Sequence, residues 1–409
     1  MIKSLFRKIS IPKISHDDFF SFSLFFLIIS IFLPIKPFSN TFINLNIISD
    51  RTISFFITIF IILLGFLKDK SHFLQSTKRI IQLFILNFSY NIFIELVIHQ
   101  GNILNYYYIS YLLNISLFIY TLRLINKNKK LISICTNTYI FCTFLSSLNI
   151  IYQSINLDNE LTRLTFITWN QNEIAIAICI GISFVIYKIF NDNLNNKEYL
   201  LYSMISAINL IAIIFTGTRS ALISIFAISI LTIFNAIKQK KYYIKTSLFL
   251  FNFIIFSSSI IFLYNPFFNI NILTRDGFLI LGGRLNIWKQ TLNNILESPL
   301  FGKGFIFLDN QLNSAGTFLG LPHNYVLENF YISGIFSCFL TIIIGLLLFI
   351  KCKINQKYNL INIILILPIY VSALLLNITQ FRLVWFCLAV IISLVDLNKT
   401  IPRISRELS

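Results

Sequence analysis

The stretch VLENFYISGIFSCFLTIIIGLLLFI, residues 326–350, sets the fold class of this chain, and Glu328 is its only charged residue. The run exceeds the ~20 apolar residues that an α-helix needs to cross the hydrocarbon core of a bilayer. Similar runs recur along the 409 residues, of which 56% are hydrophobic and 12% charged. A soluble domain carries about a quarter charged residues. The sequence therefore predicts an all-α polytopic membrane protein.

Twelve membrane spans account for the apolar runs. We place them near residues 19–36, 53–67, 80–98, 106–122, 131–152, 173–187, 199–216, 220–237, 246–264, 326–350, 359–377 and 383–397. The first run has no small-residue cleavage site after it, so we interpret it as an uncleaved span. Nine spans thus fall in residues 1–264, a long loop in 265–325, and three spans with a tail in 326–409.

The basic residues orient this layout. With the N-terminus in the cytoplasm, 24 of the 33 Lys and Arg residues fall on the inner side. Cytoplasmic loops carry such an excess in most membrane proteins. Both termini are therefore expected in the cytoplasm and the 265–325 loop outside. The net charge of +17 then reflects inner loops beside anionic lipid headgroups, so no nucleic-acid partner is expected.

The long outer loop contains an amphipathic segment, RLNIWKQTLNNILE, residues 284–297. At about 100° per residue, its apolar side chains share one arc and its polar ones the opposite arc. The apolar arc holds Leu285, Trp288, Leu292, Ile295 and Leu296, and the polar arc holds Asn286, Lys289, Gln290 and Asn293. We predict a helix at the outer membrane boundary. Arg284 falls in its first turn, facing either the helical bundle or the lipid boundary, where it would snorkel.

Two further residues on the outer side attract attention. Arg219 follows the tight Gly217-Thr218 turn between two apolar runs, and a guanidinium so close to hydrocarbon needs an anion. A lipid headgroup or the phosphate of a lipid-borne substrate would serve. His323, after Pro322, is expected in the first turn of the span that follows. It is either an inert loop residue or a base that accepts a proton from a hydroxyl.

The sequence contains few signals for metal-dependent, cofactor-dependent or disulfide chemistry. No DxD, HExxH, P-loop or GxSxG pattern appears, so neither a metal nor a cofactor is expected. Six cysteines are spread without a CxxC pair, and we interpret them as small buried hydrophobes; they are Cys135, Cys142, Cys179, Cys338, Cys352 and Cys387. Glu95, near the outer end of the third span, is either a proton-relay acid or, as we favour, a helix-packing residue with Asn87 or Asn91.

Four motifs together resemble the O-antigen ligase family of bacterial membrane glycosyltransferases. They are GTRS with Arg219, GGRLNIW with Arg284 followed by SPLFGKGF, HNYVLENFYISGIF with His323, and WNQNEIAIAI with Asn170 and Asn172. In the last motif Gln171 stands where the family often has proline. The motifs lie in about residues 165–345. The rest of the chain contributes topology only.

The resemblance implies a function. Members transfer glycan from a polyprenyl diphosphate carrier, here undecaprenyl diphosphate, at the periplasmic face of the bacterial inner membrane. Twelve spans with one large outer loop look most like the ligase, which moves O-antigen to lipid A–core by metal-independent inversion. O-antigen polymerase and a non-enzymatic glycolipid flippase are the alternatives. His323, Arg284 and Arg219 would be catalytic; Arg163, Arg275, Lys289, Asn324 and Asn172 are secondary candidates for substrate contact. The oligomeric state is open.

Overall fold

The computed structural model describes residues 73–100, 106–156, 171–192, 194–238, 284–305, 322–353, 359–376, 378 and 381–407. In these ranges every regular element is a helix and there are no strands. The elements are α4 (Gln75–Phe93), η1 (Ile94–Ile98), α5 (Tyr106–Lys127), α6 (Lys130–Asn156), α7 (Gln171–Asn191), α8 (Asn196–Thr216), α9 (Arg219–Lys238), α11 (Arg284–Glu297), α13 (Tyr325–Ser333), α14 (Ile335–Lys353), α15 (Asn359–Leu375) and α16 (Arg382–Glu407). The expected all-α architecture is confirmed for this part of the chain.

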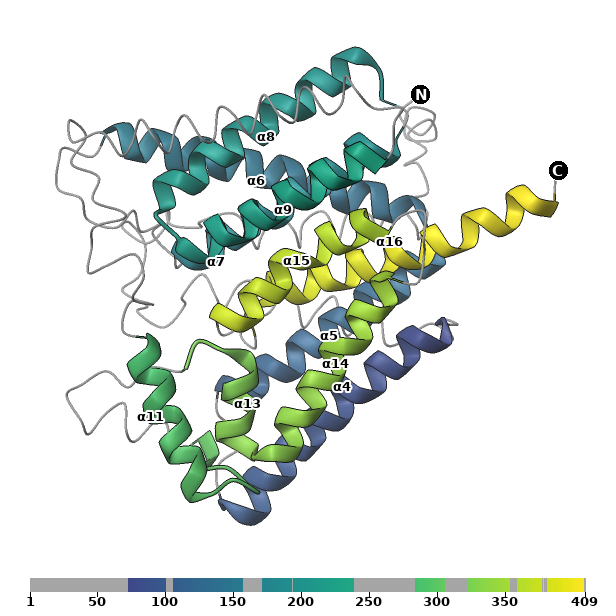
Figure 1. Cartoon of the computed structure of the whole chain (residues 1–409). Helices are drawn as coiled ribbons and strands as arrows, with labels where there is room; N and C mark the ends of the chain where they lie inside the picture. Colours follow the sequence, from purple (N-terminus) through teal and green to yellow (C-terminus); the bar gives the residue numbers. More distant parts are fainter. Residues whose placement is uncertain are drawn as a thin grey trace, which may run out of the picture.

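Helix α7 forms the centre of one group of helices. It packs against α6, α8, α9, α15 and α16, and 94% of its most apolar window is buried. Helices α4, α5 and α14 form a second group on the other side of α15 and α16, as Figure 1 shows. The first half of α16 is buried against α5 and α15. Helix α7 and the first half of α16 carry apolar residues on nearly all sides, as expected for helices that other helices surround.

The two ends of the bundle differ. One end, which we call the outer end, holds the α8–α9 turn, α11, α13 and the starts of α14 and α16; the other, the inner end, holds the α5–α6 and α7–α8 turns and the end of α14 (Figure 1). Lysines gather at the inner end, namely Lys127, Lys129, Lys130, Lys188, Lys197, Lys351 and Lys353. This distribution agrees with the predicted charge bias in the described residues.

Seven helices in the described ranges are long and apolar enough to cross a membrane. They correspond to the predicted spans near 80–98, 106–122, 131–152, 173–187, 199–216, 220–237 and 326–350. Helix α15 matches the span near 359–377, but its apolar helix, Leu360–Leu375, is shorter than the seven candidate spans. The spans predicted near 19–36, 53–67 and 246–264 lie outside the described residues, so the total of twelve stays a prediction.

Two predicted boundaries were wrong. The span placed at 326–350 is two helices, because the chain breaks at Gly334, whose φ is +80°. Only α14 is long enough to span, while α13 has nine residues. The apolar pattern runs through Gly334 without interruption, so periodicity alone hid the break. The last span, placed at 383–397, begins at Arg382, and its helix continues to Glu407.

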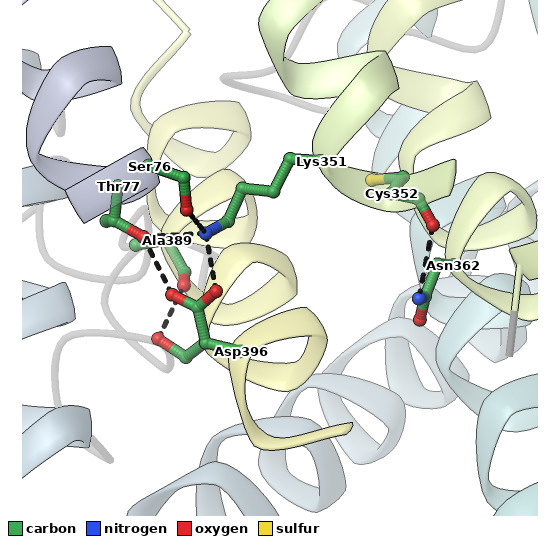
Figure 2. Close-up of polar contacts among 8 residues, drawn as sticks. Ser76, Thr77, Lys351, Cys352, Asn362, Ala389 and Asp396 are labelled. Atoms are coloured by element: carbon green, nitrogen blue, oxygen red, sulfur yellow. Dashed lines mark hydrogen bonds and ion pairs between the residues drawn. The ribbon is translucent and has the colours of Figure 1, made fainter. Parts of the chain in front are cut away.

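A buried ion pair joins helices at the inner end of the bundle. Lys351 of α14 pairs with Asp396 of α16, and the Lys351 ammonium also donates to Ser76 Oγ at 3.1 Å and Thr77 Oγ1 at 2.7 Å, as Figure 2 shows. Thr77 Oγ1 in turn donates to the second carboxylate oxygen of Asp396 at 2.7 Å. A buried charge is costly unless it is paired and hydrogen-bonded, and here both requirements are met. The cluster holds α4, α14 and α16 together.

Candidate functional site

A short loop crosses the break between α13 and α14. We call residues 298–305, with the sequence SPLFGKGF, the strap. The Lys303 N–H donates to the Tyr331 carbonyl at 2.7 Å, and the Ile335 N–H donates to the Pro299 carbonyl at 2.9 Å. The backbone groups that the break releases are thus paired with the strap rather than left without partners.

Glycines make this close approach possible. Gly302 and Gly334 have φ values of +73° and +80°, a region that other residues rarely adopt. A Cβ at Gly334 would collide with the carbonyl of Leu300, and a Cβ at Gly302 would collide with the backbone of Tyr331 and Ile332. The glycines of the SPLFGKGF and SGIF motifs are therefore explained by backbone packing.

The other side of the strap is fixed to the outer end of α4. Glu95, fully buried in the π-helical turn η1, accepts from the Phe305 N–H at 3.0 Å and from the Tyr108 hydroxyl at 3.0 Å. His99 Nε2 lies 3.1 Å from the Phe301 carbonyl oxygen. The favoured pairing of Glu95 with Asn87 or Asn91 was wrong, because both asparagines bond elsewhere. Glu95 is instead an anchor of the strap.

The amphipathic helix in the outer loop is confirmed as α11, which runs from Arg284 to Glu297, directly before Ser298-Pro299. It packs against α13. The Trp288 indole Nε1–H donates to the Pro322 carbonyl at 2.7 Å. Residue 284 lies one helical turn before Trp288, and residue 323 directly follows Pro322. One hydrogen bond therefore joins the segment that carries Arg284 to the segment that carries His323.

The predicted apolar arc of α11 divides into two stripes. Ile295 is 1% exposed and Thr291 is buried, whereas Leu285, Leu292 and Leu296 are exposed. Trp288, Thr291 and Ile295 are spaced four and three residues apart, so they share one helix face. By the same register the backbone of residue 284 lies on this face, and the choice between the bundle and the lipid boundary for Arg284 stays a prediction. The side chain of Arg284 itself lies outside the described part.

His323 lies before the helix rather than in its first turn, contrary to the prediction. Asn324 is the N-cap of α13, and its side-chain oxygen accepts from Val326 N–H at 3.0 Å and Leu327 N–H at 3.1 Å. His323 is half-buried and has a left-handed φ of +47°. Such a conformation costs an ordinary residue on the order of 1–3 kcal/mol, and strained residues cluster at functional sites.

Buried polar side chains of α4, α5 and α14 form hydrogen bonds with side chains of α13. Asn329 Oδ1 accepts from Asn91 Nδ2 at 3.2 Å and from Ser337 Oγ at 3.2 Å. The Tyr325 and Tyr111 hydroxyl oxygens lie 2.8 Å apart. Burial raises the pKa of Tyr325 well above its ordinary value.

Arg219 is the first residue of α9. The preceding helix, α8, ends at Gly217 in a left-handed conformation with φ of +61°, and nothing would crowd a Cβ there. This tight turn lies at the same end of the bundle as α11 and α13 (Figure 1). Helix α15 packs against both α9 and α13, so it connects the helix that begins with Arg219 with the helix that follows His323. The Arg219 side chain is outside the described part.

The secondary candidates are scattered in what the structure describes. Lys289 is exposed on α11, and Asn172 is half-buried in the first turn of α7. Asn324 uses its side-chain oxygen for capping. Arg163 and Arg275 lie outside the described residues. Sequence reasoning gave no special role to Arg382, which is 8% exposed and begins α16 at the outer end; a basic residue directly before an apolar run was the available signal.

No group that could hold a metal ion is found among the described residues. Amide, hydroxyl and imidazole groups dominate the polar residues near α13. Arg219 and Arg284 are the first residues of α9 and α11, which begin at the same end of the bundle as α13.

The described elements define a polytopic helical membrane protein whose outer end packs α11, α13 and the strap together. Comparison with known families is specific: residues 204–349, a little over a third of the chain, match the family described as O-Antigen ligase. The match supports assignment to the O-antigen ligase family and confirms the resemblance for this segment. It includes Arg219, Arg284 and His323, whereas Asn170 and Asn172 precede it. Among curated proteins, none matches the chain.

Proposed function

We propose that this protein is an O-antigen ligase, which transfers O-antigen from an undecaprenyl diphosphate carrier to lipid A–core. The family match supports the general class, a membrane glycosyltransferase. The observation that carries the proposal further is the hydrogen bond from Trp288 to Pro322. It holds two separate motif segments, one with an arginine and one with a histidine, next to each other. A lipid-linked donor and a hydroxyl acceptor need these two kinds of group.

The proposed reaction is a single displacement with inversion. The acceptor hydroxyl oxygen forms a bond to the anomeric carbon of the donor sugar, and the bond from that carbon to the diphosphate oxygen breaks. The diphosphate leaves with the bonding electrons, and Arg219 and Arg284 stabilise its charge. His323 takes the hydroxyl proton. In an alternative assignment His323 binds the diphosphate, and solvent or an acid residue takes the proton.

In this proposal the outer end faces the periplasm and the inner end the cytoplasm. The lysines at the inner end support this orientation, because positively charged loops stay in the cytoplasm. The donor carrier and the lipid A–core acceptor are both membrane-anchored, so they approach the outer end from within the bilayer.

A lipopolysaccharide gel tests the proposal. We expect His323→Ala, in a strain lacking the native gene, to leave bare lipid A–core while lipid-linked polymer accumulates. The control Gln290→Ala changes an exposed residue of α11 and should give the normal ladder. Core bearing one repeat unit would indicate a polymerase, and loss of all periplasmic glycan would indicate a flippase. A full ladder from inserted His323→Ala protein would exclude His323 from the mechanism.

A further inference from the structure

Helix α11 has an apolar edge that is exposed in the described part of the structure. Leu285, Leu292 and Leu296 are 50%, 45% and 75% exposed. They are spaced seven and four residues apart, so they form one stripe beside the face that packs on α13. Large exposed apolar patches mark interaction surfaces.

This edge continues into the strap. Leu300 and Phe301 are 62% and 44% exposed, and Leu300 lies four residues beyond Leu296. The strap is bonded to the start of α14 through the Ile335 N–H and the Pro299 carbonyl.

The strap in turn reaches the exposed apolar sides of two candidate spans. On α14 these residues are Ile335, Phe336 and Phe339, and at the outer end of α4 and η1 they are Phe93, Val97 and Ile98. Both helices belong to candidate membrane spans, so these sides would face lipid in a bilayer. The edge of α11 is thus continuous with a lipid-facing surface.

We infer that α11 lies in the outer leaflet of the membrane, with Leu285, Leu292 and Leu296 inserted among lipid chains. Its opposite side carries Asn286, Gln290 and Asn293, all exposed, and faces water. This division is typical of helices that lie in the plane of the interface.

Lys289 occupies the position that such a helix needs for a lipid anchor. It is exposed, and it lies four residues after Leu285 and three before Leu292, at the border of the apolar edge. A lysine at that border keeps its stem along the apolar surface and its ammonium at the lipid phosphates. Lys289 is thereby assigned to phospholipid headgroups rather than to glycan. The inference concerns the membrane and is independent of the proposed transfer reaction.

Spin-label accessibility tests the inference on the whole chain in nanodiscs of phosphatidylethanolamine and phosphatidylglycerol. Single labels are placed at Leu292→Cys and Leu296→Cys, with Asn286→Cys and Gln290→Cys as matched controls. The background carries Cys338→Ser, because Cys338 is half-buried whereas the other five cysteines are buried. Labelled Cys338→Ser protein without an added cysteine serves as the blank.

We expect oxygen to collide with labels at 292 and 296 more often than a water-soluble nickel complex does, and the reverse at 286 and 290. Nickel access at all four positions would overturn the inference. So would exclusion of both reagents at 292 and 296 with spin–spin broadening, since that result would indicate a second copy of the chain on this edge.

Discussion

The indole Nε1 of Trp288 lies 2.7 Å from the carbonyl oxygen of Pro322, 34 residues further along the chain. Proline has no N–H of its own, but its carbonyl is free to accept. The bond therefore fixes the backbone directly before His323 to the helix that begins with Arg284. It is the shortest described path between the two segments that the proposed mechanism needs together.

Removal of this bond should impair transfer more than stability. In Trp288→Phe a smaller aromatic ring replaces the indole and the N–H donor is lost, at a cost of about 1–3 kcal/mol if the carbonyl stays buried. Because a 1 Å misplacement costs up to about 100-fold in rate, we expect kcat with a defined lipid-linked donor to fall at least about 10-fold. Trp385→Phe is the control, since it removes a similar bond, 3.0 Å to the Ile378 carbonyl. Equal effects of the two changes on kcat would refute the positioning role.

Replacement of His323 by glycine should abolish the transfer reaction without lowering the stability of the fold. His323 has a φ of +47°, which glycine adopts without steric cost. We expect His323→Gly protein to unfold at the same temperature as the parent or higher, yet to lose transfer. Gln100→Gly is the matched variant, because Gln100 has a φ of +51°, and it should gain stability and keep activity. Retained transfer by His323→Gly would remove the imidazole from the reaction.

Two glycine substitutions, Gly217→Ala and Gly334→Ala, should differ in their effects. Gly217 is in the left-handed helical conformation, where an alanine costs about 1–2 kcal/mol, whereas Gly334 has φ of +80° and ψ of −169°, a conformation almost restricted to glycine, where an alanine costs about 1–3 kcal/mol. Only at Gly334 would the Cβ also collide with the strap, and overpacking adds about 1–3 kcal/mol. Thermal unfolding in nanodiscs should show a clearly larger drop for Gly334→Ala. Faster proteolysis of the strap should accompany it, and similar values for both variants would count against the described contact.

Glu95 should act as an acceptor rather than as a proton relay. A glutamine keeps an oxygen that can accept from the Phe305 N–H and from the Tyr108 hydroxyl, whereas leucine leaves both donors buried and unpaired, at about 1–3 kcal/mol each. We expect transfer by Glu95→Gln to stay within a few-fold of the parent, and Glu95→Leu to lose most activity and stability. If Glu95→Gln folds normally but is as inactive as Glu95→Leu, the carboxylate itself is required.

Apolar run length and glycine–proline punctuation were enough to predict the helices of the described bundle and the bounds of α11. The break at Gly334 escaped prediction, because isoleucine and phenylalanine follow that glycine as they would inside a span. Contact with the strap causes this break. The strap residues that meet Gly334 lie more than 30 residues earlier in the sequence, so a local pattern carries no information about the contact. The same holds for Glu95, whose partner Phe305 is 210 residues distant. His323 was placed one turn too far into the helix, because the capping role of Asn324 was not recognised.

The inner ion pair has a mechanical consequence. Helices α4 and α14 are joined at three levels: Lys351 with Thr77 at one extremity, Ser337 with Asn87 and Asn91 further along, and the strap at the other extremity. Because these three sets of contacts are spread along their length, the two helices cannot slide past each other or separate at one end. If the proposed transfer of a lipid-borne glycan requires helices to move, we therefore expect the movement in helices other than α4 and α14.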